Sequence, residues 1–131
     1  MEKKSSNLLK KYLKSRKKVL SERPVKIKVF LEEIIREIGD ASTIIVFGGR
    51  GDPSKLFSTE PRDLDLLIIT RSDKDYVEEK ISRLRPKGLT LDVIVININE
   101  YREQNKLLKK ILEKSIIIHD GLMIFGRETR K

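Results

Sequence analysis

Two aspartates, Asp63 and Asp65, stand at the head of the apolar run 64–70. They follow a pair of glycines, Gly48 and Gly49, that close an earlier β-branched run. Side chains two residues apart on a strand point to the same face, so the two carboxylates are expected to project together. Carboxylate oxygens are the ligands that Mg²⁺ and Mn²⁺ prefer in proteins. The pair is therefore a candidate for binding a hard divalent cation.

A third acid, Asp92, is the only charged residue in the apolar run 89–97. A helix predicted between this run and 64–70 allows a right-handed parallel crossover, which brings both strand beginnings to one edge of a sheet. The run 43–47 must then be antiparallel to the run 64–70, because only this direction places Gly48 and Gly49 at the same edge. Three carboxylates at one edge repel one another unless a cation lies among them. We therefore predict a metal site formed by the three aspartates.

The glycine pair suits a phosphate group beside that metal. Glycines let a backbone approach a phosphate closely, and the amides that follow can donate hydrogen bonds to its oxygens. Each feature alone has a plainer interpretation, because a Gly-Gly pair is often only a turn and aspartates often start strands. Their combination on three successive strands favours a metal–nucleotide site.

The elements that must position these residues alternate between helix and strand. Apolar spacing predicts helices over 6–20, 24–38, 72–84 and 100–114, and strands over 43–47, 64–70, 89–97 and 122–125. We expect residues 21–24 to separate the first two helices and Asn99 to cap the last one. Residues 116–118 are open between helix and strand. The order predicts an α/β (α+β) fold with a small mixed sheet of three to four strands flanked by helices.

The chain of 131 residues has the length of one domain, which we place at 23–131 after a basic N-terminal helical extension at 1–22. Residues 1–20 hold eight basic residues against Glu2, so they carry +7 of the net +9. This extension is either a solvated helix or an arm for nucleic acid or an acidic partner. With no cysteine, no signal-like segment and no apolar run of membrane-spanning length, we expect a cytoplasmic protein without disulfides.

At the glycines and aspartates the sequence resembles the nucleotidyltransferase superfamily of DNA polymerase beta, and within it the minimal nucleotidyltransferases. The resemblance spans about residues 40–126 and lies in IIVFGG, DLDLLII, LDVIVI and DGLMIFG. It implies that Asp63 and Asp65 hold two divalent ions against a nucleoside triphosphate. Asp92 would bind the catalytic ion and help to activate the acceptor hydroxyl.

The resemblance also implies that Gly48, Gly49 and Arg50 bind the nucleotide phosphates. Gly49 stands where many small members have a serine, and the loop that follows is longer than theirs. Lys55, Ser58 and Arg62 in this loop are further candidates for phosphate contact. Mg²⁺ or Mn²⁺ is the implied metal and ATP the implied nucleotide.

Many small members of this superfamily pair with an all-helical HEPN protein and act as antitoxins, some by transferring AMP to a tyrosine of that partner. We therefore expect a transferase that moves AMP to a partner protein. Two alternatives stay open: a binding module that neutralises a partner by contact alone, and an RNA-directed transferase that uses the basic N-terminus. A homo-oligomer formed through an open sheet edge is also compatible with the sequence.

Overall fold

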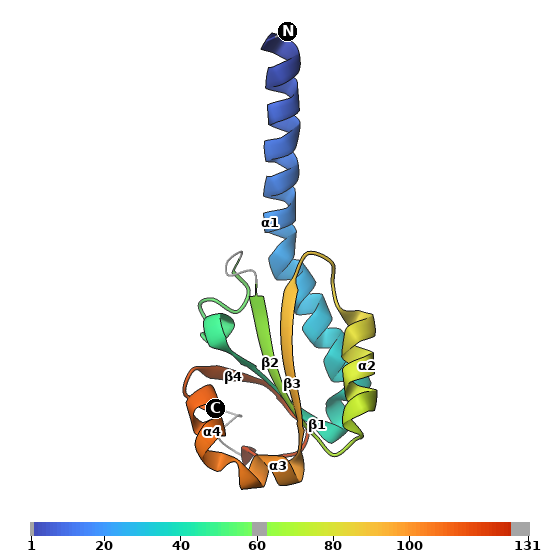
Figure 1. Cartoon of the computed structure of the whole chain (residues 1–131), viewed down its shortest axis with the longest axis vertical. Coiled ribbons are helices and arrows are strands. Elements are labelled where there is room, and N and C mark those ends of the chain that lie inside the picture. The colour runs from blue at the N-terminus through green and yellow to red at the C-terminus, as the bar shows by residue number, and fades with distance from the viewer. Residues whose placement is uncertain (1, 59–62, 127–131) are drawn as a thin grey trace.

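The computed structural model describes residues 2–58 and 63–126, apart from the side chains of residues 2–8, 12–21, 105 and 107. Its centre is a four-stranded sheet with the order β3-β2-β1-β4 (Figure 1). The strands are β1 (Ser42–Phe47), β2 (Asp63–Thr70), β3 (Thr90–Asn97) and β4 (Ser115–Asp120). β1 runs antiparallel to β2 and β4, whereas β2 and β3 are parallel. The predicted mixed sheet is confirmed.

Helices cover both faces of the sheet. α1 (Glu2–Ile38) and α2 (Lys74–Leu84) lie on one face, and α3 (Ile98–Glu103) and α4 (Asn105–Glu113) lie at the other (Figure 1). Two short 3₁₀ turns, η1 (Gly39–Ala41) and η2 (Gly48–Arg50), flank β1. No helix in the described part of the chain is long and apolar enough to cross a membrane.

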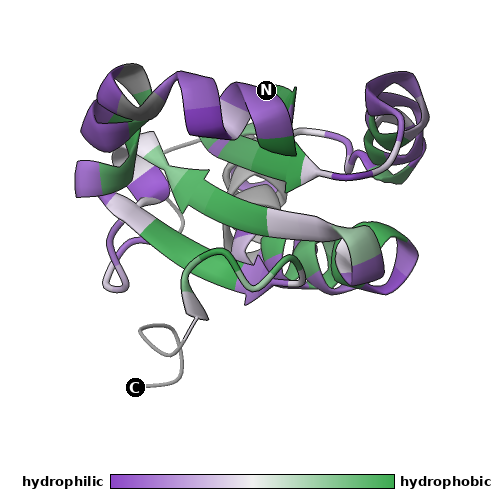
Figure 2. Cartoon of the chain, turned by 90° about the horizontal axis from the view of Figure 1, so that it is seen from below, coloured by the Kyte–Doolittle hydropathy of each residue, from purple (hydrophilic) through white to green (hydrophobic). Residues whose placement is uncertain are grey.

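β2 is buried on both of its faces, which explains its nearly unbroken apolar sequence. Leu64, Leu66 and Ile68 pack with α1 and α2 in one core cluster. Leu67 and Ile69 point the other way and pack in a second cluster that includes residues of α4. The strands accordingly form the hydrophobic centre of the molecule in Figure 2, and the outer helical turns are hydrophilic. A slip of one residue would exchange the two faces, so this double burial fixes the register of β2.

The first helix differs from the prediction, because α1 runs without interruption from Glu2 to Ile38. The break predicted at residues 21–24 is not present, although Pro24 lies inside the helix and removes one backbone donor. Burial of the residues after Pro24, including Ile27 and Phe30, offsets that loss. The N-terminal half of α1 extends beyond the rest of the molecule (Figure 1).

The C-terminal elements also differ from the prediction. Residues 100–114 do not form one helix, since α3 ends at Glu103 and α4 begins at Asn105. The ambiguous residues 116–118 belong to β4, and the strand predicted at 122–125 is absent. Asp120 accounts for this: its carboxylate accepts hydrogen bonds from Thr43 and from the amides of residues 124 and 125, and these bonds hold the segment in a turn.

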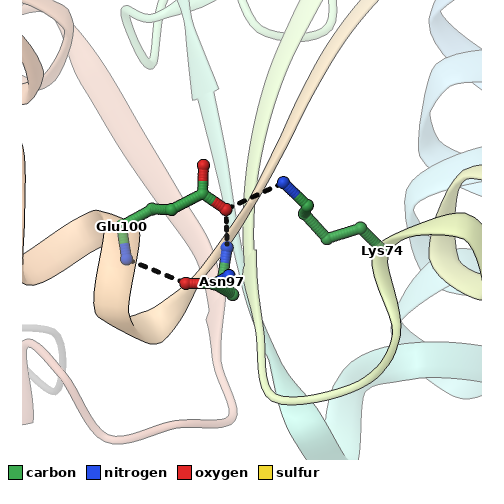
Figure 3. Close-up of polar contacts among 3 residues, drawn as sticks. All are labelled: Lys74, Asn97 and Glu100. Carbon is green, nitrogen blue, oxygen red and sulfur yellow. Dashed lines mark hydrogen bonds and ion pairs between the residues drawn. The ribbon is translucent and has the colours of Figure 1, made fainter.

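Asn97, and not the predicted Asn99, caps α3. The side-chain oxygen of Asn97 accepts from the Glu100 amide at 2.8 Å, and Glu100 Oε1 accepts from the Asn97 amide at 3.2 Å. Lys74 of α2 donates to the same carboxylate oxygen at 2.8 Å (Figure 3). The ion pair is partly exposed and adds little, so the reciprocal cap is the main local interaction.

This cap can be tested by substituting alanine for Asn97. We expect Asn97→Ala to lower the free energy of unfolding by about 1 kcal/mol, because the first turn of α3 loses its side-chain acceptor. Asn99→Ala is the matched control, since Asn99 is exposed and outside the cap. Urea denaturation followed by circular dichroism measures both, and equal losses would contradict the assignment of the cap.

Candidate functional site

The parallel pairing of β2 with β3 places two of the predicted acids side by side. Asp65 and Asp92 are direct partners in the register, and Asp63 lies opposite Thr90 two residues earlier. Because side chains alternate along a strand, all three aspartates belong to the sheet face that α3 and α4 cover further along. Ile94 on that face is 41% exposed, so the helices leave this end of the face open.

The carboxylate of Asp65 is destabilised by this arrangement, as its raised pKa indicates. Burial raises the pKa of Asp65. The pKa is raised further by the negative charge of Asp92, by a hydrogen bond with Asp92 and by the charge of Asp63. The Asp65 carboxyl group is thus within hydrogen-bonding reach of Asp92. Such a pair is destabilised when both groups are ionised, and a cation between them would relieve the repulsion.

The donor set fits a hard cation in part. In the segments that the structure describes, no three His, Cys, Asp or Glu side chains are gathered closely enough, as they stand, to hold a metal ion. Asp65 and Asp92 therefore supply an incomplete ligand set. Asp63, exposed on the same face, is a candidate to extend it. Carboxylate oxygens with no nitrogen or sulfur ligand match the preference of Mg²⁺ and Mn²⁺.

Gly48 lies directly against this acidic pair. It has φ +69°, a left-handed conformation that favours glycine, and a Cβ atom at this position would collide with Oδ2 of Asp65. Gly48 and Gly49 are exposed in the turn η2 at the end of β1. The absence of side chains at the two glycines therefore leaves the turn backbone accessible beside the carboxylates.

Arg50 occupies a different place from the predicted one. Its side chain is fully buried, and it donates hydrogen bonds to the carbonyl groups of Asp63, Lys55, Leu56 and Ser58 at 2.8 to 3.2 Å. A guanidinium that is enclosed in this way cannot reach a bound nucleotide unless the loop opens. Arg50 instead organises the loop and fixes the start of β2, and so it positions Asp63.

A shallow cavity of about 290 Å³ adjoins the glycine turn. Its lining residues are Gly48, Gly49, Gly51, Asp52, Pro53, Lys55, Glu113, Lys114 and Ser115. A neighbouring cavity of about 450 Å³ shares the two glycines and Lys114 and adds Lys110. Neither Lys110 nor Lys114 is recognisable as a site residue from the sequence, because basic residues at the end of an amphipathic helix resemble its solvated face. Their proximity to the glycines comes from the antiparallel pairing of β4 with β1.

The other loop residues proposed for phosphate contact have different outcomes. Lys55 lines the cavity beside the glycines. The Ser58 hydroxyl donates to the Lys55 carbonyl at 2.8 Å, which gives it a role within the loop. Arg62 lies outside the described residues. A separate cavity of about 320 Å³ between α2 and β3 contains none of the three aspartates.

The role of Arg50 predicts a large effect of its replacement on stability. We expect Arg50→Met to lower the free energy of unfolding by about 3 kcal/mol or more, because several carbonyl groups lose their donor inside the loop. Arg71→Met is the matched control, since Arg71 is exposed. Chemical denaturation of the two variants compares them, and a small effect at Arg50 would contradict its structural role.

The raised pKa of Asp65 predicts a pH-dependent effect on stability. The folded state favours the protonated form, so the stability contributed by this group is present below the unfolded pKa of about 3.9 and is lost as pH rises through the folded value. Without divalent ions at pH 7, Asp65→Asn should raise the free energy of unfolding by roughly 0.5 kcal/mol.

This gain should shrink as the pH falls below about 3.9, where the wild-type carboxyl is protonated as well. Thermal unfolding of wild type and Asp65→Asn between pH 3 and pH 8 tests the sign. A variant that is less stable than wild type at pH 7 and more stable in acid would contradict the repulsion between Asp65 and Asp92.

Comparisons with known proteins add no further constraint. No protein-family model matches the chain, and neither the curated proteins nor the solved structures include a significant match. The functional interpretation therefore depends on the geometry of the aspartates and the glycine turn.

Proposed function

We propose that the chain is a metal-dependent nucleotidyltransferase that moves AMP from ATP to a hydroxyl group of a partner protein. One observation carries the proposal: Asp65 and Asp92 are neighbours on β2 and β3, and the Gly48 backbone lies against Asp65. Nucleotidyl transfer needs oxygen ligands for divalent ions next to an accessible phosphate site. In this proposal the open end of the sheet supplies both.

In this proposal Asp63, Asp65 and Asp92 hold Mg²⁺ or Mn²⁺. Such ions, when bound, neutralise the charge that develops on the phosphates during transfer. The acceptor oxygen forms a bond to the α-phosphorus of ATP as the bond from that phosphorus to the β-phosphate bridging oxygen breaks, and pyrophosphate leaves. Asp92, on the exposed edge strand β3, is placed to accept the proton of the attacking hydroxyl.

The phosphates of ATP would lie over the glycine turn. Exposed amides in η2 can donate to phosphate oxygens, as in other glycine-rich anion sites. Lys110 and Lys114 line the adjoining cavities, so they supply positive charge on the side opposite the aspartates. Arg50 contributes indirectly, because it holds the loop and the start of β2 in place.

The acceptor is proposed to come from another protein. The acidic end of the sheet is open, as the exposure of Asp63, Asp92 and Ile94 shows, so a second molecule can approach it. By the resemblance noted above, an all-helical HEPN protein is the proposed partner, and the chain would act as its antitoxin. Modification of a partner side chain would need no additional acceptor domain on this chain.

Binding of ATP by the purified protein is the first test. We expect ATP to bind in the presence of Mn²⁺ and to bind at least tenfold more weakly when EDTA removes the ion. Asp65→Asn and Asp92→Asn should lose the ion-dependent part of the affinity, because each removes a carboxylate ligand. Asp75→Asn on α2 is the control, since it makes the same chemical change away from the glycines.

Transfer is tested by incubation with α-labelled ATP, Mg²⁺ and a HEPN protein. Label on the HEPN protein that disappears with Asp92→Asn would support the proposal. Ion-independent ATP binding, or equal labelling by wild type and Asp92→Asn, would refute it. If the Asp92→Asn variant still neutralises the partner and no label is transferred, the chain is a binding module instead.

A further inference from the structure

The outer edge of β3 is open. β3 is the last strand of the sheet, and no other strand in the described part of the chain pairs with its outer side. Every second residue of β3 therefore directs its amide and carbonyl groups away from β2. Asp92 and Ile94 are exposed on this strand, and Ile96 is its only buried residue. The edge is thus available for pairing with another strand.

β3 lacks most of the features that protect exposed sheet edges in other proteins. Such edges are usually short, bulged, or interrupted by lysine or proline. β3 has eight residues, contains neither lysine nor proline, and pairs with β2 in an unbroken register. Asp92 near its start is its only charged residue. β4 at the opposite edge has six residues and a register shift against β1, so β3 is the edge better suited to pairing.

A groove of about 320 Å³ lies beside this edge, between α2 and β3. It is lined by apolar and polar side chains, namely Ile81, Leu91, Val93, Glu78, Ser82 and Arg85. Leu91 and Val93 pack against the core and are nevertheless only partly buried. α2 therefore leaves the outer side of β3 incompletely covered.

The charged residues of this groove have no ion-pair partner in the part of the chain that the structure describes. Glu78, Ser82 and Arg85 are exposed and follow one another at four and three residues, so they lie on one side of α2. Three other charged residues of α2 form ion pairs, whereas Glu78 and Arg85 form none among the described residues. They are two turns apart, about 10 Å, which is too far for them to pair with each other.

We propose that β3 pairs antiparallel with β3 of a second copy of this chain, about a twofold axis at Val93 or Ile94. The two four-stranded sheets then join into one continuous sheet. Because the direction of α2 is reversed in the second copy, Glu78 of each protomer faces Arg85 of the other. The groove is in this way complementary to itself, as an isologous interface requires.

The antiparallel arrangement also keeps like charges apart. Lys26 Nζ lies 3.4 Å from the Lys87 carbonyl oxygen, and the N-terminal half of α1 leaves the molecule at this end of the sheet, where β3 begins (Figure 1). The beginnings of the two paired strands lie about 26 Å apart, which is well beyond the Debye length of about 8 Å. The two basic N-terminal segments therefore project in opposite directions. Asp92 lies opposite an isoleucine of the partner strand in either register, because residues that face each other share one face of the sheet.

A second copy fits this edge better than an all-helical partner does. The backbone groups of a helix are already bonded within it, so a helical protein has no strand to add to β3. The added strand lies beside β3 and leaves the open face with the three aspartates uncovered. The inference does not depend on the proposed enzymatic activity, since it follows from the edge of β3 and the groove beside it.

Sedimentation equilibrium of the full chain between 5 and 200 μM tests the proposal. We expect a monomer–dimer equilibrium that Ile94→Lys weakens at least tenfold, because a lysine in the middle of an edge strand opposes pairing. Met123→Lys is the matched control, since Met123 is also exposed and follows β4 at the opposite edge. Circular dichroism checks that both variants fold. A wild-type chain that is monomeric at 200 μM, or a dimer that Ile94→Lys leaves unchanged, would overturn the proposal.

A charge exchange on α2 tests the contact between the two grooves. Arg85→Glu should weaken the dimer at least threefold, because it places like charges across the interface. Adding Glu78→Arg should restore the dimer, since both ion pairs then form in the reverse sense. If the double variant is no tighter than Arg85→Glu, the two residues do not face each other and the antiparallel pairing is wrong.

Hydrogen exchange identifies the paired strand. Alternate backbone amides of β3 should exchange more slowly at 200 μM than at 5 μM in the wild-type chain, and this difference should disappear in Ile94→Lys. A dimer whose β3 amides exchange at the same rate at both concentrations would have its interface elsewhere, which would overturn the proposal.

Discussion

The side-by-side placement of Asp65 and Asp92 is the contact on which the candidate site depends. It is unfavourable by itself, since two carboxyl groups meet where burial already raises the pKa of one of them. The fold can sustain it because β2 is packed on both faces and cannot slip relative to β3. The apolar residues that follow Asp65 on β2 therefore hold the acids together. A local electrostatic cost at a site, sustained by packing elsewhere, is typical of binding and catalytic centres.

The positively charged side chain of Arg50 orders the loop between β1 and β2. The Arg50 guanidinium donates to carbonyl groups of the loop residues Lys55 and Ser58 and to that of Asp63 at the start of β2. Gly51 completes the arrangement, because a side chain there would collide with the Lys114 carbonyl of the neighbouring segment. The glycine turn is consequently held against β4 and against β2 at once, and its exposed face stays free.

β1, β2 and β3 were predictable from the sequence because their signals are periodic, whereas β4 was not. Continuous apolar runs indicated β2 and β3, and a helix between them required a parallel crossover, which then fixed the direction of β1. The role of Arg50 was not predictable, since a basic residue after two glycines suits a phosphate contact and a loop contact equally well. Asn97 and Asn99 are both good caps, and only the position of Glu100 three residues after Asn97 distinguishes them. Pro24 signals a helix break locally, but the packing of the residues after it overrides that signal.

The raised pKa of Asp65 beside Asp92 has a consequence for ion binding. A divalent cation bound at the Asp65 carboxylate would compete with protons for a group whose pKa is raised, so its binding would be linked to pH. Occupancy of such a site would decline as pH falls, and the decline would begin at a higher pH than for an isolated surface aspartate. The acidic pair would in this way make the charge state of the sheet edge respond to pH and to divalent ion concentration together.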